Sequence, residues 1–573
     1  MKPEFCLRIR CVTKKLSDFF MNQPRIPQKI NLSFFLLMGV TGFLFFFRLG
    51  VPGLMDPDEG RYAEIAREML VLGDFVTPHL NFLPYLEKPP LVYWLTAFSL
   101  ALGGLNEWAA RFIPALSAMG GVLAVYWLVN KLAGPWAAFL AGMVTATSSG
   151  YFILGRLLIL DMTLTCFLTW GIGLTYLAVR NQERRYLPWA YLTLALAVLA
   201  KGPVAVVLPG LIFSTWFLIR RDFWGFFRLW HPGGVLIFAV VVFPWYILVA
   251  LTNPDFWHYF FWQEHLERFL TPRIHAGQPF YFYAGVLVAS FLPWIFLLPW
   301  AWGRLGSERS SVQTRQDRLF LILWFGVVFV FFSLARAKLF PYLLPALPPV
   351  AILVGWALAT QEMQGSRDDS PVWAWSLRVW CSLALLLVMG LVISAVFFPL
   401  LWDRLAFLAP YPLAYMTALA GLPLLLSARL LSPVNQGRLL LAGAVGLNLL
   451  LLLGIERVAE VRSPRSMAQA IQARWSDDSA LVGFHLYSQG ISFYARQPFH
   501  LFRIRGELDF GLSQRPDNPY YFTREEQLRE LLRQHPHFFV LVDKKKLKIF
   551  QEISKDPITI LTQWKNQLLI TNR

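Results

Sequence analysis

Acidic residues open the first long polar stretch of the chain, Met55-Asp56-Pro57-Asp58-Glu59-Gly60-Arg61-Tyr62. A carboxylate such as Asp56 can act as a general base on a hydroxyl group. The same residue precedes a proline, and Glu59 follows three positions later, a spacing that predicts a capping box at a helix start. Capping and catalysis are compatible roles, and the sequence leaves both open for Asp56. For Glu59 we favour capping, and for Arg61 a solvated charge, with Tyr62 on the apolar helix face.

A second candidate lies in Tyr85-Leu86-Glu87-Lys88-Pro89-Pro90, directly before an apolar stretch. In a functional interpretation, Lys88 binds a lipid phosphate, while Glu87 binds a metal or acts as a base. The alternative is a lysine that extends to the membrane surface beside a solvated glutamate. The residues alone leave both interpretations open.

Two further charged segments interrupt apolar stretches. Asp161 ends the run Gly155-Arg156-Leu157-Leu158-Ile159-Leu160-Asp161. An ionisable group at the membrane edge is costly unless it is paired or hydrated, so Asp161 is a candidate site residue, with pairing to Arg156 as the alternative. The basic segment Arg336-Ala337-Lys338-Leu339-Phe340-Pro341-Tyr342 joins two apolar stretches and predicts an anionic partner such as a lipid headgroup, with a plain loop as the alternative.

The segment 253–280 holds three of the nine histidines, His258, His265 and His275, together with Glu264. Imidazole and carboxylate groups are ligands that zinc and other divalent metals accept. The spacing matches no fixed zinc signature. We therefore favour an aromatic, hydrogen-bonded loop over a metal site from the residues alone.

Membrane helices are the elements that must hold these residues. The 573 residues are 56% hydrophobic and only 15% charged, whereas soluble domains have about 25% charged residues. This composition excludes a disordered chain and a soluble enzyme. The net charge of +17 indicates cytoplasmic loops and no nucleic acid partner. Four scattered cysteines offer neither a disulfide framework nor a cysteine-based zinc site.

Apolar stretches predict about 13 membrane spans. The stretch 91–106 is too short to cross the hydrocarbon core, so we place it in or near the outer interface. The predicted spans lie near 31–47, 108–130, 136–155, 161–179, 187–200, 203–219, 234–251, 281–302, 319–334, 339–359, 377–400, 408–428 and 438–455.

The distribution of arginine and lysine sets the sidedness of these spans. Seven basic residues in 1–30 predict a cytoplasmic N-terminus and a retained first helix. If 91–106 crossed the membrane, the arginine-rich loop 303–318 would lie outside, whereas positively charged loops are expected on the cytoplasmic side. The membrane catalytic domain is therefore expected over 31–455, with the loops 48–107 and 253–280 on the outer side.

Hydropathy falls and charge rises in the tail 456–573, which predicts a small extracytoplasmic α/β domain. No Gly-rich phosphate loop is present, so we expect no nucleotide cofactor. Helices are predicted at Ser463–Arg474, Gln489–Ala495 and Glu525–Arg533, and strands at Ala480–Phe484, His537–Val542 and Gln563–Thr571.

Five motifs, in order and on one predicted membrane face, resemble the bacterial members of glycosyltransferase family 39. They are most similar to the transferases that place 4-amino-4-deoxy-L-arabinose on lipid A, and to their broader relatives. The motifs span most of residues 50–345, and the tail resembles the family's extracytoplasmic domain. Gly60 and the Pro89-Pro90 pair suit the broader family equally well, which leaves the sugar and the acceptor open. The matching motifs are 56–65, 87–90, 155–161, 264–269 and 338–342.

The resemblance implies a GT-C fold and roles for individual residues. Asp56 matches the catalytic aspartate, and Asp161 a second acid near the site. Glu87 and His265 match residues that bind a metal, zinc or another divalent ion, in at least some members. The donor phosphate is held by residues that match Lys88, Arg61, Arg268 and Tyr342, and Tyr62 and Tyr85 lie in or beside the same motifs.

The predicted function is transfer of a single sugar, with inversion, from a polyprenyl-phosphate donor to an extracytoplasmic glycolipid or protein acceptor such as lipid A. The expected location is the bacterial inner membrane, with the site and the tail facing the periplasm. A transporter or flippase for lipid-linked sugars is one alternative, although it should keep ionisable groups at mid-membrane positions. A second alternative is an enzyme that resembles protein O-mannosyltransferases. A third is a non-catalytic envelope scaffold, which would leave the acids clustered in the outer loop unexplained.

Overall fold

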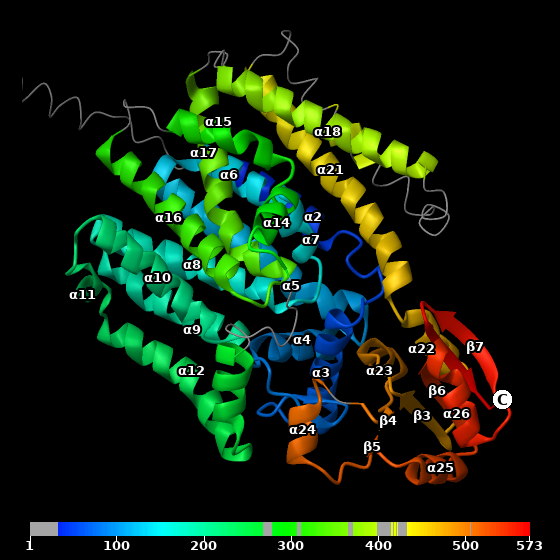
Figure 1. Cartoon of the computed structure of the whole chain (residues 1–573). Helices are drawn as coiled ribbons and strands as arrows, with labels where there is room; N and C mark the ends of the chain where they lie inside the picture. Colours follow the sequence, from blue (N-terminus) through cyan, green and yellow to red (C-terminus); the bar gives the residue numbers. More distant parts are fainter. Residues whose placement is uncertain are drawn as a thin grey trace, which may run out of the picture.

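A helical region and a C-terminal α/β domain make up the chain (Figure 1). The computed structural model describes residues 32–267, 278–305, 311–364, 371–397, 414–415, 417–419, 421, 433–504 and 506–572. The N-terminal segment 1–30, Arg268, His275 and most of the predicted span 408–428 lie outside these residues.

Every apolar stretch predicted within the described residues is helical. Six helical segments are long and apolar enough to cross a membrane, and a seventh span results if the bent pair Phe282–Ser290 and Trp294–Arg304 counts as one. The number of about 13 spans stays a prediction. The six are Glu107–Ala133 (α5), Leu160–Asn181 (α8), Pro232–Thr252 (α12), Val312–Leu334 (α16), Phe340–Met363, which contains all but the last residue of α17 (Leu347–Gln364), and Gln436–Arg462 within α21 (Pro433–Arg462).

Shorter helices fill the remaining predicted positions. The predicted interfacial stretch 91–106 is α4, a 13-residue helix that packs against α5. The pair at 187–200 and 203–219 is confirmed as two helices with a break at Gly202, which has a φ of 97°. The other helices are α2 (Leu32–Phe46), α4 (Leu91–Gly103), α6 (Pro135–Thr147), α7 (Ser149–Leu154), α9 (Leu187–Lys201), α10 (Val204–Ile219), α11 (Gly225–Leu229), α14 (Phe282–Ser290), α15 (Leu298–Leu305) and α18 (Pro371–Phe397).

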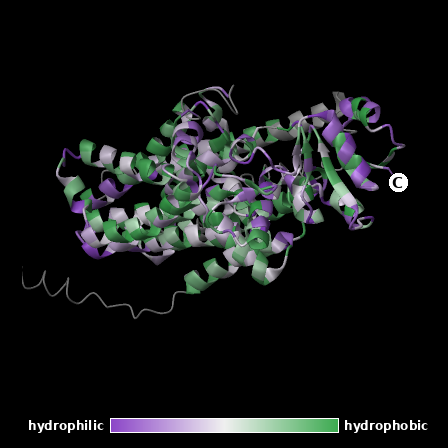
Figure 2. Ribbon diagram, turned by 90° about the horizontal axis from the view of Figure 1, so that it is seen from below, coloured by the Kyte–Doolittle hydropathy of each residue, from purple (hydrophilic) through white to green (hydrophobic). Residues whose placement is uncertain are grey.

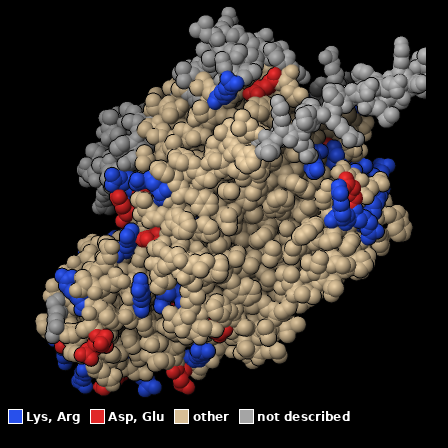
Figure 3. All heavy atoms as spheres, turned by 180° about the vertical axis from the view of Figure 1, so that it is seen from behind, with Lys and Arg blue, Asp and Glu red and all other residues tan. Residues whose placement is uncertain are grey.

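The surface of the helical region is apolar. Figure 2 shows hydrophobic residues along the outside of its helices, and α12 exposes Leu236, Val240 and Leu251. Figure 3 shows a wide face with few charged groups, which gather at its edges and over the C-terminal domain. Exposed apolar area of this extent is what a bilayer covers, because soluble monomers rarely expose large apolar patches.

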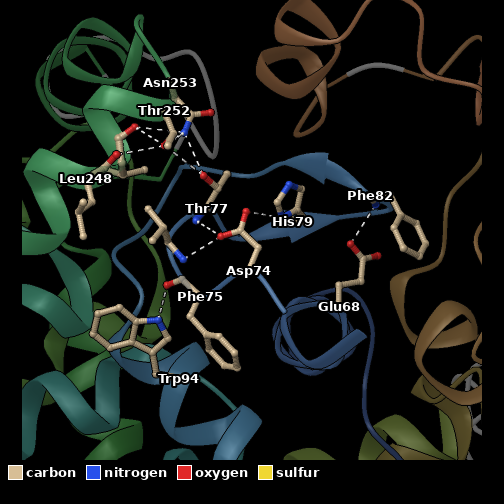
Figure 4. Close-up of polar contacts among 12 residues, drawn as sticks. Glu68, Asp74, Phe75, Thr77, His79, Phe82, Trp94, Leu248, Thr252 and Asn253 are labelled. Atoms are coloured by element: carbon tan, nitrogen blue, oxygen red, sulfur yellow. Dashed lines mark hydrogen bonds and ion pairs between the residues drawn. The ribbon is translucent and has the colours of Figure 1, made fainter. Parts of the chain in front are cut away.

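The loop 48–107, called the first outer loop after its predicted location, is an ordered structure. It contains α3 (Asp58–Leu72) and a short antiparallel hairpin, β1 (His79–Leu80) and β2 (Leu83–Pro84). Asp74 Oδ1 accepts from Thr77 N at 3.0 Å, Trp94 Nε1 donates to the Phe75 carbonyl at 2.7 Å, and Asn253 Nδ2 donates to Thr77 Oγ1 at 3.0 Å (Figure 4). These bonds tie the loop to α4 and to the end of α12.

The C-terminal domain is a mixed sheet in the order β5-β4-β3-β6-β8-β7. The helices predicted near 463–474, 489–495 and 525–533 and the strands near 480–484 and 537–542 are confirmed. Its strands are β3 (Ser479–Phe484), β4 (His500–Phe502), β5 (Tyr521–Phe522), β6 (His537–Asp543), β7 (Thr559–Trp564) and β8 (Gln567–Thr571), and its helices are α22 (Arg465–Gln472), α23 (Gln489–Ala495), α24 (Asp509–Gln514), α25 (Glu525–Gln534) and α26 (Leu547–Ser554).

The prediction of one closing strand over 563–571 is wrong. Trp564 pairs with Gln567, so Lys565 and Asn566 form a two-residue turn between β7 and β8. Lys565 has a φ of 54°, which is typical of such hairpin turns. Lys565 lies in this turn, with its ammonium 4.2 Å from the centroid of the Trp564 ring.

The first outer loop and the C-terminal domain share one hydrophobic core. Ile65 and Met69 of α3 pack in the same buried cluster as Met467 of α22 and Ile491 of α23. On the neighbouring face of α3, Ala63 belongs to a second cluster that also contains Phe493 of α23, Ala97 of α4 and Ala109 of α5. The acids of the loop consequently lie at the boundary between the two regions.

Candidate active site

Asp56 does not cap the helix that follows it. Helix α3 has Pro57 at its N-cap position, with no side-chain capping bond. The carboxylate instead faces the C-terminal domain, where Ser488 Oγ donates to Oδ2 and Gly490 N donates to Oδ1 at 2.9 Å. The capping interpretation of Asp56 is wrong because these partners, far away in sequence, take both carboxylate oxygens.

Burial raises the pKa of the half-buried Asp56 to about 6. The bonds from Ser488 and Gly490 lower this pKa, as do the positive charges of Arg61 and Lys565, but burial outweighs them. A carboxylate with this pKa is largely ionised at neutral pH and is a stronger base than an ordinary aspartate. Its protonation state suits proton abstraction at physiological pH.

Glu59 does bond to the backbone before α3, since Met55 N donates to Oε2 at 3.0 Å. It also forms a buried ion pair with Arg111 of α5, whose Nε lies 2.7 Å from Oε1. Arg111 donates further to the carbonyl groups of Leu49 and Gly53 at 3.2 and 2.9 Å. This ion pair fixes the start of the first outer loop. Arg111 was not identified from the sequence as a structural residue, although it is a charge within an apolar stretch.

Arg61 is not a solvated charge, since its side chain is only 16% exposed and pairs with carboxylates; its role in holding the donor phosphate stays a prediction. Its Nε lies 2.7 Å from Oε2 of Glu507 in the C-terminal domain, and Nη1 lies 3.4 Å from Asp58 Oδ1. Glu507 was not predicted, because an acid in a loop of the tail carries no local signal. Burial raises the pKa of the neighbouring Tyr85 well above its ordinary value, so its hydroxyl stays protonated and can donate a hydrogen bond.

A second group of predicted residues lines a cavity of about 780 Å³ in the helical region. Its walls come from the start of α8, the turn between α9 and α10, the π-helix His258–Glu267 and the end of α16. Most of the lining is apolar, with rings such as Trp257, Phe261 and Phe332. The polar groups are Lys88, Asp161, Lys201, His258, Glu264, His265 and Tyr342.

The partner of Asp161 is Lys201, so the alternative interpretation, pairing with Arg156, is not what the structure shows. Lys201 ends α9, and its ammonium group contacts Asp161 Oδ1 directly. Arg156 instead donates to main-chain carbonyls, among them that of Phe47 at 2.7 Å. The Lys201 ammonium also lies 4.4 Å from the centroid of the Tyr342 ring, so a cation and a phenol converge at the cavity.

Lys88 lies at the same cavity, where its ammonium is 3.7 Å from Glu264 Oε2 and donates to the Glu87 carbonyl at 2.8 Å. His265 Nδ1 lies 2.6 Å from the Phe260 carbonyl. A carbonyl only accepts, so Nδ1 carries a proton, and in the neutral ring Nε2 bears the lone pair. Of the predicted basic segment 336–342, Tyr342 lines the cavity. The buried Lys338 instead donates a hydrogen bond to the Ala335 carbonyl.

The described residues contain no group of three or more His, Cys, Asp or Glu side chains that could hold a metal. The ion pair between Lys88 and Glu264 does bring together the two segments that carry Glu87 and His265. A lone pair on Nε2, set by the bond of Nδ1 to a carbonyl, is the usual arrangement of a ligating histidine.

Two groups of residues are thus brought together. Asp56, Arg61 and Glu507 lie at the boundary with the C-terminal domain, and Asp161 and Lys88 lie at the cavity. The Tyr62 hydroxyl lies within electrostatic reach of both groups, since Arg61 and Asp58 as well as Asp161 and Glu87 influence it. Tyr85 is buried next to Tyr62 and Arg61. Of the predicted site residues, Arg268 and the spare candidate His275 lie outside the residues with described positions.

Comparisons with known proteins show which sequences and structures this chain resembles. Residues 87–247 match the family model described as dolichyl-phosphate-mannose-protein mannosyltransferase, and residues 467–572 match the aminoarabinose transferase C-terminal domain. An undecaprenyl phosphate-alpha-4-amino-4-deoxy-L-arabinose arabinosyl transferase from Erwinia tasmaniensis is 32% identical over 507 residues, which cover 85% of this chain and 88% of that protein. A relative of the same name with the number 2, from Sodalis glossinidius, is 30% identical over 87% of this chain and 90% of its own length.

Solved structures show the same fold. The crystal structure of ArnT from Cupriavidus metallidurans bound to undecaprenyl phosphate matches with a TM-score of 0.82 at 25% identity, covering 94% of this chain and 98% of that one. The apo oligosaccharyltransferase of Archaeoglobus fulgidus shares the fold at a TM-score of 0.50 and 14% identity, covering 90% of this chain and 69% of that one.

The helical membrane fold and these similarities define a glycosyltransferase of the GT-C class that uses a lipid-linked sugar. The protein is a multi-pass membrane protein. The chain belongs to the family of undecaprenyl phosphate-alpha-4-amino-4-deoxy-L-arabinose arabinosyl transferases.

Proposed function

We propose that this enzyme transfers 4-amino-4-deoxy-L-arabinose from undecaprenyl phosphate to lipid A at the periplasmic face of the bacterial inner membrane. The cavity is the observation that carries this proposal. Its apolar walls suit a polyprenyl chain, while Lys88 and Lys201 supply positive charge for a phosphate. The names of the relatives supply the sugar and the lipid carrier.

In the proposed reaction an acceptor oxygen attacks the anomeric carbon in line with the departing phosphate. The bond between that carbon and the phosphate oxygen breaks with its electron pair, and the anomeric centre inverts. Asp56 takes the proton of an acceptor hydroxyl, or orients the acceptor if the attacking group is itself a phosphate. Lys88 and Lys201, with Tyr342 and Arg268, stabilise the negative charge that develops on the leaving phosphate.

The direct test combines the purified full-length enzyme with synthetic undecaprenyl-phosphate-linked aminoarabinose and lipid A. Mass spectrometry should detect aminoarabinose on lipid A. The match of residues 87–247 to protein mannosyltransferases makes a protein acceptor the second candidate, and transfer to protein in membranes, without transfer to lipid A, would favour it. Movement of the intact donor across vesicles without any transfer would indicate a flippase.

Replacing Lys88 by Ala should weaken donor use because one cation is lost at a partly desolvated phosphate site. A hydrogen bond to a charged group contributes about 1.5–3 kcal/mol, so kcat/KM for the donor should fall about 10- to 100-fold. Steady-state kinetics with varied donor measure this. Lys131→Ala, in the last turn of α5, is the matched control and should behave as wild type. Unchanged donor kinetics in Lys88→Ala would remove Lys88 from the site.

We further propose that Glu87 and His265 hold a divalent metal, zinc or another, with His275 as a spare ligand. When bound, the metal would screen the charge of the donor phosphate. Elemental analysis of purified wild type should find metal that His265→Ala lacks. His258→Ala changes another histidine of the same cavity and should retain it. Equal metal content in wild type and His265→Ala, or none in either, would contradict this assignment.

A further inference from the structure

Both oxygens of the Asp56 carboxylate bond to residues of the C-terminal domain. Ser488 Oγ donates to Oδ2, and the main-chain Gly490 N donates to Oδ1 at 2.9 Å. Ser488 and Gly490 are both buried. The acid is thus anchored across the boundary between the membrane region and the tail.

Two glycines, one from each side, make this contact sterically feasible. A Cβ at Gly490 would lie 2.5 Å from Asp56 Oδ1 and 2.7 Å from Pro464 Cγ. A Cβ at Gly60 would overlap Asp56 Oδ1 and would lie 2.6 Å from Gly490 N. Any larger residue at either position would therefore displace the carboxylate or separate the two helices. The absence of a side chain at Gly60 and Gly490 thus lets the carboxylate lie between α3 and the start of α23.

The surrounding packing holds the two partners rigidly. Helix α23 packs on α3 through shared apolar clusters. Tyr494 of α23 donates to Glu107 Oε1 at 3.0 Å and accepts from Leu54 N at 2.7 Å. On the other side of α3, Asn81 Nδ2 donates to the Phe499 carbonyl at 2.9 Å. Movement of α23 relative to the outer loop would break these bonds together.

We propose that Ser488 and Gly490 are positioning residues for Asp56, so that the C-terminal domain completes the catalytic centre by fixing and orienting the acid. This inference rests on the proposed role of Asp56 in transfer. Two donors on opposite oxygens restrict rotation of the carboxylate and leave its other lone pairs for the acceptor. A base held in one orientation avoids the loss of rate that follows from small misplacements.

The same contacts give the proposal a measurable signature. The groups that act on the Asp56 carboxylate are Ser488 and Gly490 of the α23 region, Arg61 of α3 and Lys565 of the β7–β8 turn. All four lower its pKa against the effect of burial. Removing the Ser488 hydroxyl should therefore raise this pKa further above 6. The acid would then lose its charge at a higher pH than in wild type.

The test is the pH dependence of kcat/KM for transfer by full-length Ser488→Ala. The acidic limb should move upward by about one pH unit, which is a tenfold loss of rate below the wild-type midpoint with recovery at higher pH. Ser488→Thr keeps a hydroxyl and should restore the wild-type limb. Ser513→Ala removes another serine hydroxyl of the same domain and should leave the limb unchanged. A wild-type limb in Ser488→Ala would overturn the proposal.

Ser488 also accepts a bond from Ile491 N at 3.4 Å, so its replacement could loosen α23. Gly490→Ala provides a second, independent variant. Its new Cβ should displace the carboxylate and lower kcat at least tenfold without raising KM for the donor. Gly285→Ala in α14, where a Cβ meets nothing within 4 Å, should keep full activity. Unchanged kcat in Gly490→Ala would overturn the proposal even if Ser488→Ala fails to fold.

Failure of this inference can be separated from failure of the proposed function. If Asp56→Asn still transfers sugar, Asp56 is not the acid and the positioning role falls with it. If Asp56→Asn is inactive while Ser488→Ala and Gly490→Ala behave as wild type, only the positioning role is overturned.

Discussion

Asp56→Asn is expected to lower sugar transfer by about 10²- to 10⁴-fold, the range typical of a general base. The amide keeps an oxygen that can accept from Gly490 N or Ser488 Oγ, so the side chain should stay in place. The negative charge is lost, and an amide cannot take a proton from an acceptor hydroxyl. Folding should change little, because α3 does not depend on Asp56 for its cap.

The measurement is transfer from the lipid-linked donor by purified variants, with donor binding determined in parallel. Donor binding should persist in Asp56→Asn, since Lys88 and Lys201 at the cavity are unaltered. Asp58→Asn, two residues later, removes an exposed carboxylate and is the matched control. Near-normal transfer by Asp56→Asn would show that the acid is structural, and Asp161 would become the leading candidate.

The outcome for Asp56 shows where local patterns are insufficient. The Asp-Pro-x-Glu spacing does mark a helix start, and α3 begins within two residues of the predicted position. The capping bond itself is absent because the carboxylate meets Ser488 and Gly490, more than 430 residues later in the chain. A sequence pattern that covers one helical turn therefore cannot predict these two partners.

Helices and strands were predictable because their signals are local. Long apolar runs marked the membrane helices, and short continuous apolar runs marked β3 and β6, which are buried along nearly their whole lengths. Strands β4 and β5, of three and two residues, are too short to form such a run. The β7–β8 turn lies inside an apparently continuous strand pattern, so the hairpin was predicted as one strand.

Lys201, Glu507 and Arg111 were missed for a related reason. Each is a single charge whose function depends on a partner from another element: Asp161, Arg61 and Glu59 respectively. Hydropathy shows only that such a charged residue lies at a helix end or in a loop, and it does not identify the partner. A charge that interrupts an apolar stretch, as Arg111 and Lys201 do, is nevertheless a signal that a buried partner exists.

The ion pair between Asp161 and Lys201 has the second-largest expected effect. Both side chains are nearly buried at the cavity, with exposed fractions of 10% and 13%. Removing one partner of a buried pair leaves an uncompensated charge, at a cost of about 3–5 kcal/mol. Asp161→Asn and Lys201→Met should therefore each lower thermal stability in detergent, and each should abolish most transfer.

The double variant Asp161→Asn/Lys201→Met separates structure from catalysis. With both charges gone no unpaired charge remains, so much of the lost stability should return, because neutral replacements of buried pairs are often tolerated. Transfer should not return, since the Lys201 ammonium beside Tyr342 is expected to bind the donor phosphate. Thermal unfolding and donor kinetics on the four proteins of this cycle measure the two effects independently. Recovery of both stability and transfer would mean that the pair only supports the fold, and Lys88 would then remain the main cation for the phosphate.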